Sequence, residues 1–401
     1  MLKLLLCSDL HIGRTPARLP PAWRPAARTA AVWDALVQSA CRENVHAVIL
    51  GGDVVDAENG FWEALGPLES GVQTLANAGI RTIAVAGNHD ATVLPRLAAL
   101  LPAEHFTLLG RQGTWEDLLL HENHTPVLRL RGWSFPRTHF PDDPLDTFPP
   151  LPADGIPTLG IVHGDLGAGA SHYAPLSLSR LQQQPLAGWL LGHLHNPTPR
   201  TGTPWVLMPG TPQPLDPSET GAHHAWLTQL EDGSLTQPVP IWSAPLRYHP
   251  LEIRLTPDMP PGEDLLRQHI LDALQDLNAS QTVLRISLTG ETPDPALIDT
   301  LIENLRDWSP GGHAIIERIR NHTHPPIDPE ACEQLGGIHA MLARLCTDAP
   351  PQALHAHLRQ ITAEIQRQRE FDGKQLPPAT PPDPRHLAET LLHRLLREAA
   401  P

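Results

Sequence analysis

Five short clusters of Asp, His and Asn residues mark this 401-residue sequence, because each one directly follows an apolar run that is typical of a strand. Asp53, in the run GGDVVD, is central among them. A carboxylate has lone pairs on both oxygens, so Asp53 can bridge two cations if its neighbours supply the other ligands. The candidate metal ligands, in chain order, are Asp9, His11, Asp53, Asn88, His163, His193 and His195.

The spacing of these residues favours a two-metal site. Asp9 and His11 are two residues apart at a strand end, where alternate side chains share a face, and the pair at 193 and 195 repeats this arrangement. The other ligands add a neutral amide oxygen and an imidazole nitrogen, which gives two mixed N/O sites that share Asp53. Such sets suit Mn²⁺, Fe or Zn²⁺, and the absence of thiolates removes any strong preference for zinc. Two cations about 3.5 to 4 Å apart hold a bridging hydroxide and a phosphate for in-line hydrolysis.

His89 is the candidate catalytic residue beside the predicted ligand Asn88. Its imidazole can stabilise the developing charge or protonate the leaving oxygen. Asp56, three residues after the bridging carboxylate, is a candidate to fix the tautomer of His89. Each motif alone is weak evidence for a metal site in a chain with 23 histidines. Five motifs in order, each after a strand-like run, reduce coincidence to about one in a hundred or less.

The elements that must position these residues alternate short strands with helices over the first 240 residues. Helices are expected near 25–42 and 61–78, the second ended by Gly79. Strand, helix, strand at this spacing predicts parallel βαβ units, whose ligand sites collect at the carboxyl ends of strands. The later strands lack comparable helices, so we expect a second, more antiparallel sheet packed on the first. The expected strands are 2–7, 46–50, 81–86, 127–133, 158–162, 188–191 and 205–208.

The sequence pattern changes near residues 245 and 325, which predicts three regions: 1–245, 246–325 and 326–401. The middle region has the pattern of a small α/β module, and the last is purely helical. Asp328 is expected to cap one helix that runs to about 346, and Gly373 to stop a second. A third helix from 383 carries a leucine face. The module's expected elements are strands at 251–255, 283–288 and 314–319 and helices at 262–277 and 295–305.

Length and composition limit the classes of protein to which the chain can belong. A chain of 401 residues that is 41% hydrophobic can bury two or three cores. The absence of long apolar runs excludes a membrane-spanning helix, and four scattered cysteines favour a reducing, cytoplasmic location. The net charge of −15 opposes binding of nucleic acid by the chain alone. Bound cations offset part of that charge, and the remainder favours a partner that supplies much of the DNA affinity.

The ordered motifs resemble those of calcineurin-type metallophosphoesterases. Within that superfamily the chain is most similar to the SbcD nucleases, the bacterial relatives of the Mre-type DNA repair nucleases. The motif GNHD at 87–90 and the turn PGTP at 209–212 carry this second resemblance. The segments HYAPLSL at 172–178 and PSETG at 217–221 look like the YhaO-like subgroup of repair exonucleases.

The resemblance implies a two-sheet αββα sandwich, followed by a small α/β capping module and C-terminal helices. It implies two metal ions, most typically Mn²⁺, and His89 as the catalytic histidine. The pairing of Asp56 with His89 is typical of the phosphatases, since archaeal Mre-type enzymes place a histidine where this chain has Asp56. One metal would be held by Asp9, His11, Asp53 and His195, and the other by Asp53, Asn88, His163 and His193.

The same resemblance implies partners. Region 246–325 would cap DNA, and the final helices would bind the coiled coil of an SbcC-like, SMC-type ATPase. The family precedent is a homodimer. The leucine face of the last helix can equally pack on its own domain, and the sequence leaves both options open.

The function predicted from these features is a two-metal DNA exonuclease in repair, with endonuclease action left open. A phosphatase or small-phosphodiester hydrolase on the same fold is the alternative enzyme, and it predicts a closed pocket and no use for the C-terminal regions. A non-catalytic binding platform is an alternative of another class. It predicts missing ligands, and the sequence contains the complete set.

Overall fold

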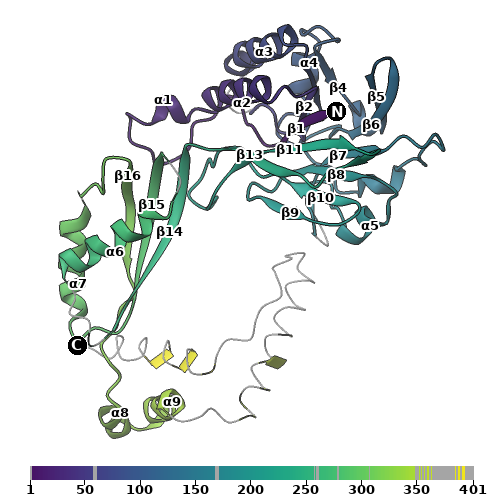
Figure 1. Ribbon diagram of the computed structural model, residues 1–401. Coiled ribbons are helices and arrows are strands. Elements are labelled where there is room, and N and C mark those ends of the chain that lie inside the picture. The colour runs from purple at the N-terminus through teal and green to yellow at the C-terminus, as the bar shows by residue number, and fades with distance from the viewer. Residues whose placement is uncertain are drawn as a thin grey trace. The chain divides into compact units, whose positions relative to one another are not determined.

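The structure, a computed structural model, describes residues 2–347 except 57–60, 168–170, 257, 259–261, 278–279 and 307, and beyond 347 only isolated residues. The chain forms two compact units, each described here by itself. One comprises Met1–His249 with Ala279–Val283, and the other Pro250–Asn278 with Leu284–Pro401. Figure 1 traces the chain through both units.

The first unit begins with a seven-stranded sheet in the order β12-β11-β1-β2-β3-β4, with β13 paired to β11. Strands β1 to β4 are parallel, and β11 runs antiparallel to β1. Helices α2 and α3 pack together along one side of this sheet (Figure 1). The strands are β1 Lys3–Cys7, β2 Ala47–Leu50, β3 Arg81–Ala84, β4 Phe106–Leu108, β11 His224–Glu231, β12 Ser234–Leu235 and β13 Val239–Ser243. The helices are α1 Arg24–Ala27, α2 Thr29–Glu43, α3 Phe61–Asn77 and α4 Leu94–Ala98.

The second sheet of this unit has six strands in the order β5-β6-β7-β8-β10-β9. The prediction that it is more antiparallel than the first is wrong for its centre, where β6, β7, β8 and β10 are parallel. Only the edge pairs are antiparallel. The connection 134–157 returns the chain through loops and one 3₁₀ turn, so a parallel crossover forms without a long helix. The elements are β5 Glu116–Glu122, β6 Thr125–Trp133, β7 Thr158–His163, α5 Leu178–Gln183, β8 Gly188–Gly192, β9 Thr198–Arg200 and β10 Trp205–Met208.

The first sheet is apolar along its whole strands because both of its faces are buried. In β1, Leu5 and Cys7 pack on the helical side, while Leu4 and Leu6 face the second sheet. A third cluster, around Trp189, fills the outer face of the second sheet. The layers are therefore helices, sheet, sheet and helix, which confirms the predicted αββα sandwich.

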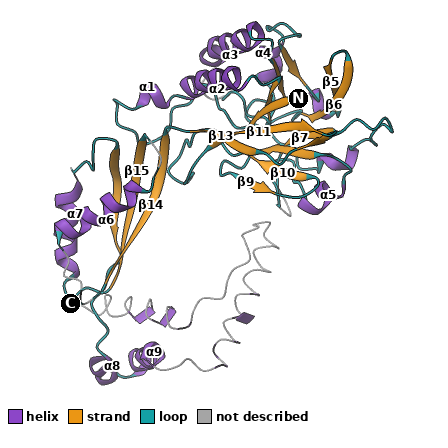
Figure 2. Cartoon of the chain, viewed as in Figure 1, coloured by secondary structure: helices purple, strands orange, loops and turns teal. Residues whose placement is uncertain are grey.

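The second unit is built on a three-stranded sheet in the order β14-β15-β16. Helices α6 and α7 lie along this sheet (Figure 2), and Ile270 of α6 and Ile298 of α7 share its core. All five elements expected in this region are present, so the predicted α/β module is confirmed. They are β14 Leu246–Leu255, α6 Glu263–Gln275, β15 Gln281–Gly290, α7 Pro295–Arg306 and β16 Ala314–Asn321.

Two short helices follow, α8 Pro329–Leu335 and α9 Gly337–Thr347, where one helix was expected. The predicted cap is confirmed, because the Asp328 carboxylate accepts hydrogen bonds from two backbone N–H groups of α8. Gly336, with a φ of 67°, breaks the helix. The predicted stop at Gly373 and most of the predicted last helix lie outside the described residues. Over the part of the chain that the structure describes, no helix has the length and apolarity needed to cross a membrane.

Candidate metal centre

All seven predicted ligands lie at or just beyond the ends of strands in the first unit. The parallel strands β1, β2 and β3 of one sheet and β7 and β8 of the other end near one another, because the two sheets pack face to face. Each loop then needs only one or two polar residues to complete a site. Asp9 and His11 follow β1, Asp53 follows β2, Asn88 follows β3, His163 ends β7, and His193 and His195 follow β8.

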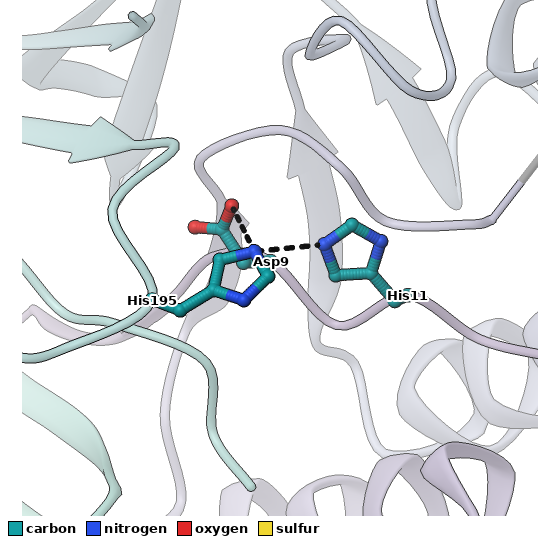
Figure 3. Close-up of side chains that lie close together, drawn as sticks. All are labelled: Asp9, His11 and His195. Carbon is teal, nitrogen blue, oxygen red and sulfur yellow. Dashed lines mark hydrogen bonds and ion pairs between the residues drawn. The ribbon is translucent and has the colours of Figure 1, made fainter. Parts of the chain in front are cut away.

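One group of ligand atoms joins residues from two distant loops (Figure 3). His195 Nε2 lies 3.3 Å from His11 Nε2 and 3.9 Å from Asp9 Oδ1. These three residues could hold a metal ion, as could Asp9 together with Asp53 and His163. The two groups overlap at Asp9, so the side chains form one continuous cluster.

The remaining ligands extend this cluster. Asn88 Oδ1 lies 3.1 Å from both His163 Nε2 and His193 Nδ1. The Oδ2 atom of Asp53 lies 3.3 Å from His163 Nε2 and 3.9 Å from His11 Nε2. Asp53 thus stands between the two predicted ligand sets, which is the place that a bridging carboxylate requires. The assignment of ligands to individual metal ions stays a prediction.

The backbone at the cluster is held in an unfavourable conformation. The φ angles of Asp9, His11, Asp53 and His193 are 56°, 45°, 47° and 105°. Non-glycine residues rarely adopt positive φ, and each such residue carries a cost of about 1–3 kcal/mol. Four strained ligands in one cluster indicate that the surrounding structure is selected to aim these side chains.

Two residues that the sequence did not point to hold the ligand loops together. The Asp90 carboxylate accepts hydrogen bonds from Val54 N at 2.7 Å and from Gly87 N at 2.7 Å, which ties the loops after β2 and β3. The Thr29 hydroxyl, at the start of α2, bonds the backbone oxygen of His11 at 2.9 Å. Such bonds to backbone groups leave no pattern in a sequence, although Asp90 is itself the last residue of the GNHD motif at 87–90.

Burial and charge set the pKa values in the cluster. Burial lowers the pKa of His11 and of His193 to about 3 each, so both imidazoles are neutral and can donate a lone pair. Burial also opposes charge on His163 and Asp53, but the attraction between the two groups outweighs it. The pKa of His163 rises to about 9, and that of Asp53 falls well below its usual range. Burial raises the pKa of Asp9.

This donor set fits divalent cations. Carboxylate oxygens, an amide oxygen and imidazole nitrogens converge without any thiolate, which suits Mn²⁺, Fe or Zn²⁺. Bound cations would polarise a phosphate and activate water for its hydrolysis. The protein itself contributes the fixed positions of the donors and the nearly complete burial of Asp9, His11 and Asp53.

His89 lies beside this cluster, and its catalytic role stays a prediction. Its backbone N–H donates to Asp53 Oδ1 at 2.9 Å, and its ring meets that of His11 edge-on with centroids 5.1 Å apart. The ion pair seen for Asp56 is with Arg14, whose Nε lies 3.2 Å from Asp56 Oδ2. The proposed pairing of Asp56 with His89 stays a prediction.

The chain is similar to known proteins in sequence and in structure. The metallophosphoesterase YhaO of Bacillus subtilis, itself named as uncharacterized, is 24% identical over 204 residues, which is 50% of this chain and 49% of that protein. Solved structures that resemble the chain include a dimetal phosphatase from Danio rerio, at 14% identity and a TM-score of 0.36, covering 58% of this chain and 93% of that one. The protein TT1561 of Thermus thermophilus has 14% identity and a TM-score of 0.35, covering 60% and 98%.

The match to YhaO spans about half the length of each protein. The family model described as calcineurin-like phosphoesterase matches residues 2–205, about half of the chain and all seven predicted ligands. The chain therefore belongs to the calcineurin-like phosphoesterase family.

Proposed function

We propose that this phosphoesterase is a DNA nuclease with exonuclease action that works as the nuclease subunit of an SbcC-like ATPase complex. The observation that carries the choice of a polymeric phosphate substrate is a pocket of about 470 Å³ in the first unit, lined by two arginines. Its lining residues are Gly13, Arg14, Thr15, Arg28, Ala30, Glu63 and Pro67.

The pocket begins two residues after the predicted ligand His11. Arg14 is near enough to His11 for its charge to contribute to the low pKa of that histidine. A substrate with a single phosphate needs no further anion site, whereas a nucleic-acid strand presents a neighbouring phosphate beside the one that is cut. The two arginines lie together in a chain with a net charge of −15, although Glu63 also lines the pocket and Arg14 pairs with Asp56.

The second unit supports the same proposal. A small-ester hydrolase would not need the α/β module or the helices after it, whereas a nuclease subunit can use them for DNA capping and partner binding. Helices α8 and α9 expose Leu335, Ile338 and Met341 at 59%, 52% and 55%. Exposed apolar side chains that cluster on one short helical segment are typical of an interaction site.

The test compares Mn²⁺-dependent cleavage of linear DNA with hydrolysis of bis-p-nitrophenyl phosphate, with and without the partner ATPase. Both substrates should be cleaved, and His89→Ala should lower kcat on both by about 10²- to 10⁴-fold, the usual contribution of a positioned acid or base. His124→Ala, at a turn histidine outside the cluster, is the matched control. Hydrolysis of the small ester with DNA left intact, even with the ATPase present, would contradict the nuclease and favour a phosphodiesterase of small substrates.

A further inference from the structure

Glu219 is a buried carboxylate that touches the metal cluster but belongs to none of the predicted ligands. It lies in the loop after β10 and is 7% exposed. Its Oε1 atom lies 2.7 Å from Nδ1 of His195, a predicted ligand 24 residues earlier in the chain. Burying a carboxylate costs free energy unless its oxygens accept hydrogen bonds. The groups that bond to Glu219 therefore indicate its role.

Both oxygens of Glu219 accept hydrogen bonds. Oε2 accepts from the backbone N–H of Leu215 at 2.7 Å and from the Thr211 hydroxyl at 3.2 Å. Thr211 is itself held by the buried His223, whose Nδ1 lies 2.8 Å from the Thr211 carbonyl oxygen. The donors on Oε2 fix the carboxylate, which leaves Oε1 as the acceptor that faces His195.

This arrangement decides which nitrogen of His195 carries a proton. Oε1 of an ionised carboxylate can only accept, so Nδ1 of His195 must donate. A neutral imidazole protonated at Nδ1 has its lone pair on Nε2. That nitrogen is the one that faces Asp9 Oδ1 and His11 Nε2, at 3.9 and 3.3 Å.

We propose that Glu219 is a positioning residue that fixes the tautomer and the ring orientation of His195, so that Nε2 is presented to a metal ion. His163 is oriented in an equivalent way by a backbone group, because its Nδ1 lies 3.1 Å from the Gly51 carbonyl oxygen. Histidine ligands generally donate their second N–H to such an acceptor, and loss of the acceptor weakens metal binding about 10- to 100-fold. The proposal rests on the metal-dependent site and is independent of the DNA substrate.

The variant Glu219→Gln tests this role with the least change of shape. An amide has one acceptor oxygen, and the buried Leu215 N–H requires it, so the amide NH₂ group turns toward His195. That group donates, which makes Nδ1 the acceptor and moves the proton onto Nε2. We expect one of two Mn²⁺ equivalents to bind about 10- to 100-fold more weakly in calorimetric titration, with the other unchanged.

Two controls separate positioning from a purely structural role. Glu231→Gln changes an exposed glutamate on β11 and should bind both Mn²⁺ ions normally. Thr211→Val removes one hydrogen bond to Oε2 but leaves the contact with His195, so it should lower the apo melting temperature more than it changes Mn²⁺ affinity. Binding of both ions by Glu219→Gln with wild-type affinity would overturn the proposal.

A measurement on the unaltered chain keeps the proposal falsifiable if Glu219→Gln does not fold. Long-range ¹H–¹⁵N spectra of the Zn²⁺-loaded, diamagnetic protein report the protonation of each imidazole nitrogen, and His195→Gln identifies the signals of His195. We expect a proton on Nδ1 and the shift of a metal-bound nitrogen on Nε2. A metal-bound Nδ1 would show that Glu219 does not orient this ligand.

Discussion

Asp53 uses its two carboxylate oxygens for two different tasks. Oδ1 accepts the backbone N–H of His89, while Oδ2 faces both His163 and His11. An asparagine can satisfy the N–H, but its NH₂ group then faces the ligands and cannot bind a cation. Asp53→Asn should therefore lower the metal content at both sites, measured after dialysis as equivalents per chain. Asp34→Asn, on the exposed face of α2, is the control, and two full equivalents in Asp53→Asn would exclude a bridging role.

At this scale the sequence indicated which seven side chains meet in the cluster, but it did not indicate the residues that hold them in place. The seven ligands carry a pattern because each follows a strand, and parallel strands end together. Glu219 and Asp90 act through contacts that are 24 and 36 residues distant in sequence, or through backbone N–H groups, so no local spacing reveals them. The pairing of Asp56 with Arg14 was not predicted either, because an ion pair depends on the path of the intervening loops.

At the scale of elements, the loop after β3 approaches the loop after β2 so closely that Gly87 has no room for a side chain. A Cβ atom at Gly87 would lie 2.2 Å from Asp53 Oδ1 and 2.7 Å from Asp53 N. Gly87→Ala should therefore displace Asp53, lower the melting temperature and reduce Mn²⁺ binding. Gly66→Ala is the matched control, because a Cβ there meets nothing within 4 Å and alanine favours the helix α3. A Gly87→Ala variant with wild-type stability and Mn²⁺ affinity would show that the two loops can separate freely.

The elements themselves were largely predictable, and the exceptions have physical reasons. Buried strands appear in a sequence as continuous apolar runs, which makes them predictable. All seven strands expected in the first unit are present in the structure. The helix expected at 25–42 is divided at Arg28, whose extended backbone (ψ of 140°) allows Thr29 to reach the loop of His11. The direction of the strands in the second sheet was not predictable, because loops rather than helices make its crossovers. Short edge strands such as β9 and β12 carry too few residues for a pattern.

At the scale of the whole molecule, the net negative charge of the chain repels a negatively charged phosphate substrate. Two divalent cations would offset only part of a net charge of −15, so the field far from the site still repels DNA. Local arginines at the pocket act over about 10 Å or less at physiological salt. The proposed DNA substrate would therefore be captured efficiently only with a partner that has its own DNA affinity.

Helices α8 and α9 have two apolar sides with different environments. Cys332 and Leu342 are buried together with Ala388 and Leu392, so part of the predicted last helix packs within its own unit. Leu392 of the predicted leucine face is buried there, whereas Leu391 of the same face is 43% exposed. Ile338 and Met341, three residues apart on one face of α9, remain exposed. We therefore expect α8 and α9 to supply the apolar surface for the ATPase coiled coil.

A charge placed on this face tests the partner surface directly. The double change Ile338→Glu with Met341→Glu should abolish co-elution with a coexpressed SbcC-like ATPase, since a charge buried at an apolar contact cannot be solvated. Hydrolysis of bis-p-nitrophenyl phosphate should persist, because the metal cluster lies in the other unit. Leu297→Glu, at a 39% exposed position on α7, is the matched control and should co-elute normally. A double variant that folds by circular dichroism and still co-elutes would place the partner on another surface.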